Sequence, residues 1–326
     1  MIPGKGAEIR HGVELVSGTI QEGHLFHLNI PVLTTAKPAQ ADKEEELKAE
    51  DVVVWHRRLA YSGIGNVRKL KKQARGIKIT EGSQLRVCGI CLAGKHHHHP
   101  SHKSSMHTMV PSELIHEDMS GKIEPTTIGG FNYYALFIDD ATRMTYYALM
   151  KTNGSQELLE HFKGFRKLIN NELDTKIKRL RTDNGSEYKK HVDKFLKQKG
   201  IKHELTAPYH PDQNGVAENA NRTIMERTRA VIQDGKFPEK LWAEIAGTVL
   251  YLKNRSSTKA LDNQTPYEAW YKEKPDLQHL RILGSPAYIH VPKEKHIKLD
   301  NHTIKGQLVG YGGQTNGKHG YPKGMK

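Results

Sequence analysis

The chain has 326 residues, enough for two or three domains, and its 50 Lys and Arg against 36 Asp and Glu give a formal net charge of +14. Because the basic residues are spread along the whole chain, this excess favours nucleic acid as the partner, ahead of a membrane or a merely solvated basic surface. The sequence has no run of about 18 apolar residues, no apolar signal-peptide core and only two cysteines, which argues against a membrane span, secretion and a disulfide framework and indicates an intracellular protein.

Two segments precede the main part of the chain. Residues 1–50 are predicted to be a flanking segment, with short β-like runs first and a polar, acidic linker or exposed helix after residue 35. Residues 51–102 are predicted to form a compact, basic and helical segment that contains Cys88 and Cys91 and ends in a histidine tract.

Residues 103–275 alternate between strand-like and helix-like patterns. Three consecutive strands followed by helix–strand–helix–strand and further helices predict an α/β fold, a mixed sheet with helices packed on it. Residues 276–326 remain as a C-terminal region, expected to be truncated. The predicted strands lie at 113–118, 133–139, 145–151, 177–183 and 201–207, and the predicted helices at 155–173, 191–200, 216–235 and 238–256.

Three acidic residues stand at the ends of predicted elements. Asp118 and Asp183 each close a predicted strand, and Glu218 opens a predicted helix with 34 residues between it and Asp183. Carboxylates are preferred ligands of Mg²⁺ and Mn²⁺, and a pair of such ions can drive an in-line phosphoryl displacement. These three residues are therefore predicted to be catalytic and to bind two divalent ions. The competing interpretation is ordinary solvated surface, since the chain has 36 acidic residues.

Asp139 and Asp140 are rival candidates for the same chemistry. They end the strand predicted at 133–139 and precede Ala141-Thr142-Arg143, a stretch typical of a hairpin. A cap or turn role is therefore favoured for both.

Several long phrases, in order, resemble the integrase of copia-type LTR retrotransposons from about residue 54 to residue 309. The resemblance implies an RNase H-like catalytic core at 103–275 that carries the triad of retroviral-type DDE integrases, at Asp118, Asp183 and Glu218. The spacing of 34 is one residue short of the usual one, and Asn219 and Ala220 stand where the family has basic or polar residues. The phrases that carry the resemblance are HEDMSG, FNYYALFIDDATRMTYYALMK, RTDNGSEY, LTAPYHPDQNGVAENANRT, LWAEIAGTVLYLKNRS and NQTPYEAWYKEKPDLQHLRILGSPAYIHVPKEK.

The resemblance also implies an activity and its setting. The enzyme would remove terminal nucleotides from the element's DNA ends and then join the 3′ hydroxyl to target DNA. Its cofactors would be two Mg²⁺ or Mn²⁺ ions per active site, and it would act as a homo-oligomer in the nucleus. DNA is the expected partner, and RNA is a second candidate.

The segments WHRRLAYSG and CGIC resemble the small zinc-binding segment that precedes the copia-type core, whose pattern is His-x4-His and then Cys-x2-Cys. His56, Cys88 and Cys91 match this pattern, whereas Tyr61 replaces the second histidine. Three interpretations stay open: a metal-free site, a weak Zn²⁺ site with water as fourth ligand, or a site completed by a histidine of the tract 96–99 or by His102. A redox role for the cysteines is disfavoured, because no thioredoxin-like strand–helix pattern surrounds them.

Contacts to nucleic acid are expected along the helix of Glu218 and in the loop before it. Asn221, Arg222 and Arg229 follow Glu218 on this helix. The resemblance places the loop 206–215, with Asn214 and Gly215 at its end, over the active site and against DNA. Other basic groups, at 71–78, 161–167 and 176–179, are more often solvated faces.

Two further hypotheses compete with an active integrase. The protease and the reverse transcriptase of the family are absent from the sequence, so the chain is expected to be a fragment of a polyprotein or a decayed copy. It could then be a catalytically inactive, nucleic-acid-binding remnant, which Tyr61 favours and the three intact acids disfavour. An RNase H-like nuclease that cuts without joining DNA ends is the third hypothesis.

Overall fold

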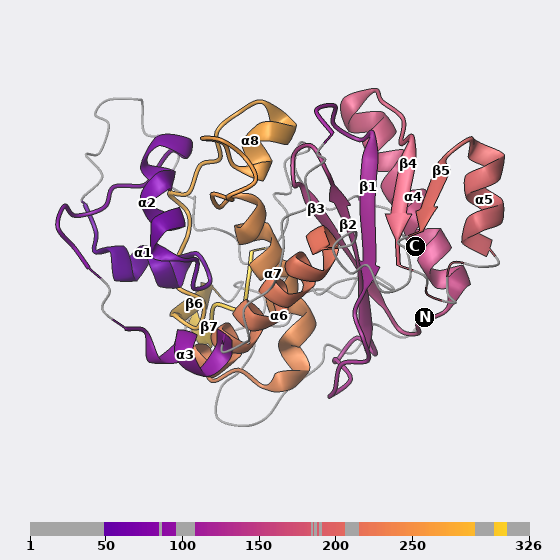
Figure 1. The fold of residues 1–326 in the computed structure, drawn as a ribbon. Coiled ribbons are helices and arrows are strands. Elements are labelled where there is room, and N and C mark those ends of the chain that lie inside the picture. Colours follow the sequence, from indigo (N-terminus) through magenta and orange to yellow (C-terminus); the bar gives the residue numbers. More distant parts are fainter. Residues whose placement is uncertain are drawn as a thin grey trace.

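A computed structural model describes residues 49–84, 87–95, 108–183, 185, 188, 191–205, 215–290 and 303–311 (Figure 1). The flanking segment predicted before residue 49, the histidine tract, most of the loop 206–215 and the tail after residue 311 lie outside these residues. Within them, no helix is both long and apolar enough to cross a membrane.

A five-stranded sheet with the strand order β3-β2-β1-β4-β5 forms the centre of the molecule. The first three strands, β1 (Leu114–Met119), β2 (Tyr133–Asp139) and β3 (Thr145–Met150), pair antiparallel in sequence order. The strands β4 (Arg179–Thr182) and β5 (Lys202–Leu205) then extend the sheet parallel to β1. This mixed sheet with flanking helices is the RNase H-like arrangement that was predicted.

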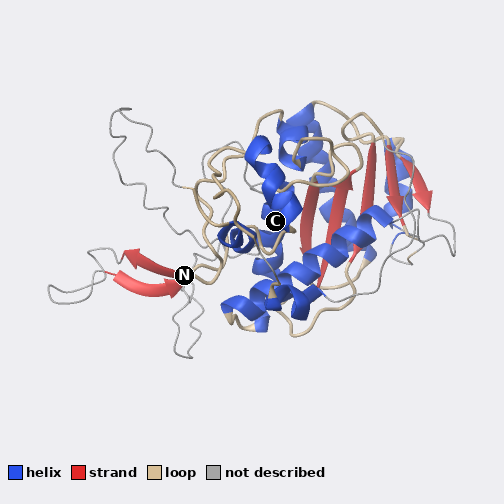
Figure 2. Ribbon diagram, turned by 60° about the vertical axis from the view of Figure 1, so that its left-hand side comes forward, coloured by secondary structure: helices blue, strands red, loops and turns tan. Residues whose placement is uncertain are grey.

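Helices cover both faces of the sheet because the strand residues alternate between two apolar cores. Phe137 of β2 stacks on Phe165 of α4 (Ser155–Leu173), with ring centroids 4.8 Å apart, and α5 (His191–Lys199) joins this face. Tyr134, three residues earlier, faces the opposite core, which α6 (Gly215–Gly235) and α7 (Trp242–Asn254) complete. Figures 1 and 2 show the sheet between these two pairs of helices.

The predicted elements agree closely with the observed ones. The helix predicted at 155–173 is α4, and α6 begins one residue before the predicted helix at 216–235. The helix predicted at 238–256 is divided into a 3-10 turn, η3 (Glu239–Leu241), and α7. The helix predicted at 191–200 is α5, which Gly200, with φ of +68°, ends as a glycine cap.

The N-terminal helices α1 (Val52–Arg58), α2 (Ile64–Gln73) and α3 (Gly89–Lys95) lie on the side of α6 and α7 that faces away from the sheet (Figure 1). They share one apolar cluster with α6 and α7. The contact between α3 and α6 is close, because a Cβ at Gly94 would lie 3.3 Å from the Cβ of Ala230. The helical character predicted for 51–102 is therefore observed in its described part, whereas a domain boundary after residue 102 stays a prediction.

The C-terminal region folds back onto both preceding parts. After α8 (Pro266–Tyr271), the chain passes Arg75, whose backbone N–H donates to Pro275 O over 2.9 Å. The strands β6 (Pro286–His290) and β7 (Thr303–Gln307) pair antiparallel. Gly284, just before β6, has φ of +89° and approaches α6 so closely that a Cβ there would lie 2.9 Å from Gly235 Cα. A glycine is therefore required at 284 by both backbone and packing.

Candidate active site and metal-binding cluster

Asp118 and Asp183 lie on neighbouring parallel strands at the same level of the sheet. The register pairs Ile115 with Leu180 and His116 with Arg181, and continuing it by two residues brings Asp118 level with Asp183. Ile115 and Leu180 point into the core beneath α4 and α5. Because side chains alternate along a strand, both aspartates point to the opposite face, towards α6.

The helix α6 crosses this face of the sheet and carries Glu218 in its first turn. Ala217 and Ile224 are buried against the sheet, whereas Glu218 is exposed. Asn221 stands four residues after Ala217, on the buried side of the helix, and its Nδ2 donates a hydrogen bond to Asp118 Oδ2. The contact predicted between Asn221 and DNA stays a prediction; in this structure its amide holds a carboxylate.

The electrostatics of Asp118 reflect a cluster of negative charge. Burial raises the pKa of Asp118 to about 6, the hydrogen bond from Asn221 acts against this, and repulsion from Asp183 and Glu218 adds to it. A raised pKa from burial and neighbouring carboxylates is typical of sites that bind a divalent cation. The three carboxylates are nevertheless spread out: among the residues that the structure describes, their oxygens do not form a group within 4.8 Å of one another.

The turn after β4 orients the Asp183 side chain. Its Oδ1 accepts a hydrogen bond of 3.0 Å from the backbone N–H of Gly185. Such Asx turns are the reason why Asp-Asn-Gly sequences leave strands sharply. The turn after Asp183 therefore does more than end the strand, because it also fixes one carboxylate oxygen.

The rival pair has the turn role that was favoured for it. Asp139 Oδ1 accepts hydrogen bonds from the N–H and hydroxyl of Thr142, over 2.8 and 2.6 Å. Asp140 Oδ1 contacts His116 Nε2 at 3.0 Å and Arg143 Nη1 at 3.1 Å. Burial alone would raise the pKa of Asp140, but the hydrogen bonds and positive charges around it outweigh burial and lower it. Both carboxylates are thus bound by residues of the hairpin and, through His116, of β1.

Of the remaining residues predicted to contact DNA, Gly215, Arg222 and Arg229 belong to α6. Gly215 begins the helix, and Asn214 lies outside the described residues. Arg222 is half-buried and donates to Asn219 Oδ1 over 3.0 Å. Asn219, at a position where the resemblance implied a basic residue, is therefore hydrogen-bonded to a basic side chain. Arg229 is exposed.

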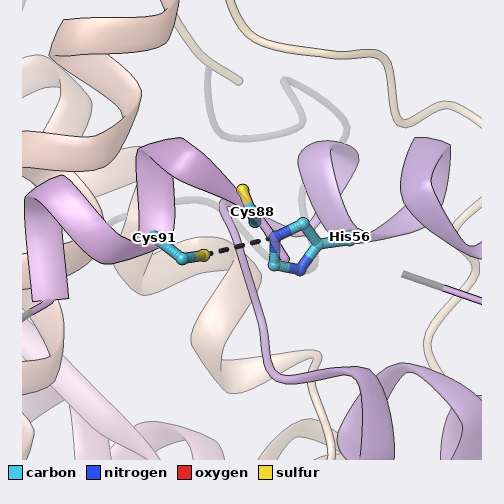
Figure 3. A group of neighbouring side chains, drawn as sticks. All are labelled: His56, Cys88 and Cys91. Atoms are coloured by element: carbon cyan, nitrogen blue, oxygen red, sulfur yellow. Dashed lines mark hydrogen bonds between the residues drawn. The ribbon is translucent and has the colours of Figure 1, made fainter. Parts of the chain in front are cut away.

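His56, Cys88 and Cys91 form the second cluster, and their potential ligand atoms all lie within 4.8 Å of one another (Figure 3). His56 stands in the last turn of α1, Cys91 in α3 and Cys88 just before α3. His56 Nε2 is 3.3 Å from Cys91 Sγ, and His56 Nδ1 is 2.7 Å from Ser62 O. A carbonyl only accepts, so Nδ1 carries the hydrogen and Nε2 presents its lone pair to the sulfurs. Two cysteines and such a histidine fit three positions of a zinc site.

Tyr61 does not supply a fourth ligand. Its ring lies edge-on to His56 with centroids 5.2 Å apart, while its phenol interacts with Asp234 at the end of α6 and with Arg57. Burial and Asp234 raise the pKa of Tyr61 well above its ordinary value, which keeps the phenol neutral. Arg57 Nη2 also donates to Asp234 Oδ2 over 2.7 Å. Tyr61, which replaces a histidine of the pattern, is therefore part of the contact between α1 and α6.

Arg227 is a residue near this cluster that the sequence patterns did not indicate. It belongs to α6, is buried, and interacts with Cys91, while burial lowers its pKa to about 10. Its position on the helix, three residues after Ile224, was a signal that the side chain faces the interior.

Residues 111–211 match the family model of the integrase core domain, a segment that includes Asp118 and Asp183 but ends before Glu218. The matched segment is thus assigned to the polynucleotidyl transferase superfamily. It is also similar to retrovirus-related Pol polyproteins of plant transposons: 34% identical over 285 residues to that of TNT 1-94 from Nicotiana tabacum, and 27% and 26% identical over 258 residues to those of RE2 and RE1 from Arabidopsis thaliana. Residues 111–211 thus match an integrase core domain, and the chain is similar to the integrase region of LTR-retrotransposon Pol polyproteins.

These alignments cover most of this chain and little of its relatives. They include 87% of the chain and 21% of the TNT 1-94 polyprotein, and 79% of the chain and 17% of the RE2 and RE1 polyproteins. The chain therefore spans about a fifth of the length of the curated relatives that it matches.

Two solved structures resemble about half of the chain. One is described as the HTLV-2 integrase catalytic core domain in complex with magnesium in a trimeric form; it is 17% identical, has a TM-score of 0.39, and the match covers 50% of this chain and 98% of that one. The catalytic core domain of BIV integrase is 19% identical, has a TM-score of 0.37, and the match covers 49% and 95% of the two chains.

Proposed function

We propose that the chain is a copia-type integrase that uses Asp118, Asp183 and Glu218 to process the 3′ ends of element DNA and to join them to target DNA. The observation that carries this proposal is the placement of Asp118 and Asp183 at one level of two parallel strands, under the helix that carries Glu218. The raised pKa of Asp118 supports it, because a group of carboxylates that repel one another attracts a divalent ion.

The three carboxylates have one common role, which is to hold Mg²⁺ or Mn²⁺ through hard oxygen ligands. Bound ions of this kind activate the attacking oxygen and neutralise charge on the leaving oxygen. Asp118 is kept in place by Asn221 and Asp183 by the N–H of Gly185, so two of the ligands are oriented before an ion arrives. Glu218, exposed at the start of α6, completes the set from the solvent side.

The reaction has two displacements at phosphorus. In end processing, a water oxygen attacks a phosphodiester near the 3′ end; a new P–O bond forms, the bond to the 3′ oxygen breaks, and the element is left with a 3′ hydroxyl. In strand transfer, that hydroxyl oxygen attacks a phosphodiester of target DNA, and the 3′ oxygen of the cut target strand leaves with a proton. The partners are therefore element and target DNA, and the expected setting is a homo-oligomer in the nucleus.

A strand-transfer assay tests the proposal. Labelled blunt duplex DNA and a supercoiled plasmid are incubated with wild type, with Asp183→Asn and with Asp262→Asn, which changes an exposed aspartate of the loop before α8 in the same way. Wild type and Asp262→Asn are expected to give joined product with Mg²⁺ or Mn²⁺, and Asp183→Asn none. Equal background product from all three, with DNA binding intact, contradicts the catalytic role, and cleavage without joining indicates a nuclease instead.

The cluster of His56, Cys88 and Cys91 is proposed to bind Zn²⁺ weakly. The donor set fits zinc, and His56 is oriented by Ser62, but Tyr61 is directed to Asp234. Because three protein ligands leave one position for water, we expect a lower affinity than a Cys₂His₂ site has. Zn²⁺ binding that Cys91→Ser abolishes supports the site, and a stoichiometry unchanged by Cys91→Ser contradicts it.

Tyr61 also favours the second candidate function, a nucleic-acid-binding remnant without turnover. Its replacement of a metal ligand is the change expected when a site is no longer under selection for zinc. The same strand-transfer assay separates the two functions, because a remnant would bind DNA and give no product with any divalent ion.

A further inference from the structure

A chain of three hydrogen-bonded side chains ends on the main chain of Asp183. Asp193 of α5 contacts Nδ1 of His203 in β5, and His203 Nε2 lies 2.9 Å from the hydroxyl of Thr182, the last residue of β4. The Thr182 hydroxyl in turn donates to the backbone carbonyl of Asp183 over 2.8 Å. The residues come from three elements, and none of them was among the predicted site residues.

The direction of the hydrogen bonds follows from the groups involved. A carboxylate only accepts, so the hydrogen between Asp193 and His203 belongs to Nδ1. The hydroxyl of Thr182 has a single hydrogen, which the Asp183 carbonyl receives. The lone pairs of the hydroxyl oxygen are therefore left for the contact with His203 Nε2, 2.9 Å away. In this arrangement His203 orients Thr182, and Asp193 orients His203.

The chain of hydrogen bonds lies behind the active site. Thr182 is fully buried and points, like Leu180, towards the core beneath α4 and α5, whereas the Asp183 side chain points towards α6. The side chain of His203 is only 11% exposed, and Tyr188 lies edge-on to its ring. The three side chains therefore reach Asp183 through its main chain and leave its carboxylate free for an ion.

The Asp183 carbonyl needs such support because the sheet ends there. The pairing of β4 with β5 stops at Thr182 and Leu205, one residue earlier. Beyond this last pair of residues, the Thr182 hydroxyl donates to the Asp183 carbonyl, and the N–H of Gly185 donates to Asp183 Oδ1. Two fixed points on one residue determine where its carboxylate stands.

We propose that Thr182, oriented by His203 and Asp193, is a positioning residue that sets the Asp183 carboxylate for divalent-ion binding. This inference rests on the metal-binding role of Asp183 proposed above. It predicts that the hydroxyl of residue 182, and not merely its size, is required for tight binding of the ion.

Mn²⁺ affinity, measured from the free-ion signal in electron paramagnetic resonance, tests the inference without any DNA substrate. Thr182→Val keeps the shape and removes the hydroxyl, and it is expected to weaken Mn²⁺ binding about tenfold or more. Thr182→Ser restores the hydroxyl and should stay within about threefold of wild type. The matched control is Thr248→Val in α7, another buried threonine whose hydroxyl donates to a carbonyl, that of Glu244 over 3.0 Å. It should bind Mn²⁺ as wild type does.

His203→Ala tests the same chain of hydrogen bonds from its other end, on the edge strand β5, in case Thr182→Val does not fold. We expect it to weaken Mn²⁺ binding about threefold, because the Thr182 hydroxyl remains but loses its orientation. Wild-type affinity in folded Thr182→Val and in His203→Ala would overturn the inference. Asp183→Asn separates this failure from a failure of the proposed function: if it too binds Mn²⁺ like wild type, then Asp183 is no ligand at all.

Discussion

The raised pKa of Asp118 predicts that the proposed active site destabilises the protein as long as no ion is bound. Folding raises the pKa of Asp118 from 3.8 to about 6. The protonated carboxyl is thus favoured by folding, and this stability is fully present below pH 3.8 and is lost as the pH rises through about 6. At about 1.4 kcal/mol for each pKa unit, the ionised carboxylate costs up to about 3 kcal/mol at pH 7.5.

Replacing Asp118 with asparagine should remove this cost, since an amide oxygen can still accept the hydrogen bond from Asn221. In urea denaturation without divalent ions, we expect Asp118→Asn to be more stable than wild type by about 1–3 kcal/mol at pH 7.5 and by about half as much at pH 5. Asp262→Asn, at an exposed position, serves as the control. Saturating Mn²⁺ should stabilise wild type and leave the variant unchanged. A variant that is less stable than wild type at pH 7.5 would refute the reasoning.

Three further changes test other parts of the structure. Tyr61→His restores the fourth ligand of the pattern and should tighten Zn²⁺ binding at least about tenfold in chelator competition, whereas an unchanged affinity would show that residue 61 cannot reach the ion. Gly284→Ala should lower the free energy of unfolding by at least about 2 kcal/mol more than Gly82→Ala does, because both have positive φ but only the Cβ at 284 meets another backbone; equal urea midpoints would contradict this. Arg57→Ala should cost about 1 kcal/mol by loss of the bond to Asp234, a modest amount because the arginine side chain is 40% exposed, and no change in unfolding free energy would show that the contact is solvent-screened.

The strands and helices of the core could be predicted because each has a local pattern. The nearly continuous apolar run of β2, a strand buried on both faces, and the apolar spacing of α4 each indicate burial within a single element, and the predicted and observed bounds agree. The sequence also allowed the prediction that Asp118 and Asp183 lie near each other, since both acids stand at the ends of strands of one sheet.

Contacts between elements distant in the sequence could not be read from such patterns. Arg57 and Asp234 are 177 residues apart, and only the packing of α1 against the end of α6 brings them together. Thr182, His203 and Asp193 each have an unremarkable local context, and their hydrogen bonds exist only because β4, β5 and α5 meet.

Asn221 is an instructive intermediate case. It was predicted to contact DNA, as part of the helix of Glu218, and the structure directs its amide to Asp118. The signal was present in the sequence, because Asn221 stands four residues after Ala217 and three before Ile224, both buried. A polar residue on the buried side of a helix needs a partner inside the protein.

The central claim is that Asp118 and Asp183 share a divalent ion with Glu218. Crystals soaked in Mn²⁺ test it most directly, because the anomalous scattering of manganese locates the ion independently of the protein model. We predict an anomalous peak between the carboxylates of Asp118 and Asp183, absent from crystals of Asp183→Asn. Peaks confined to other acidic residues, with none between these two aspartates, would contradict the account.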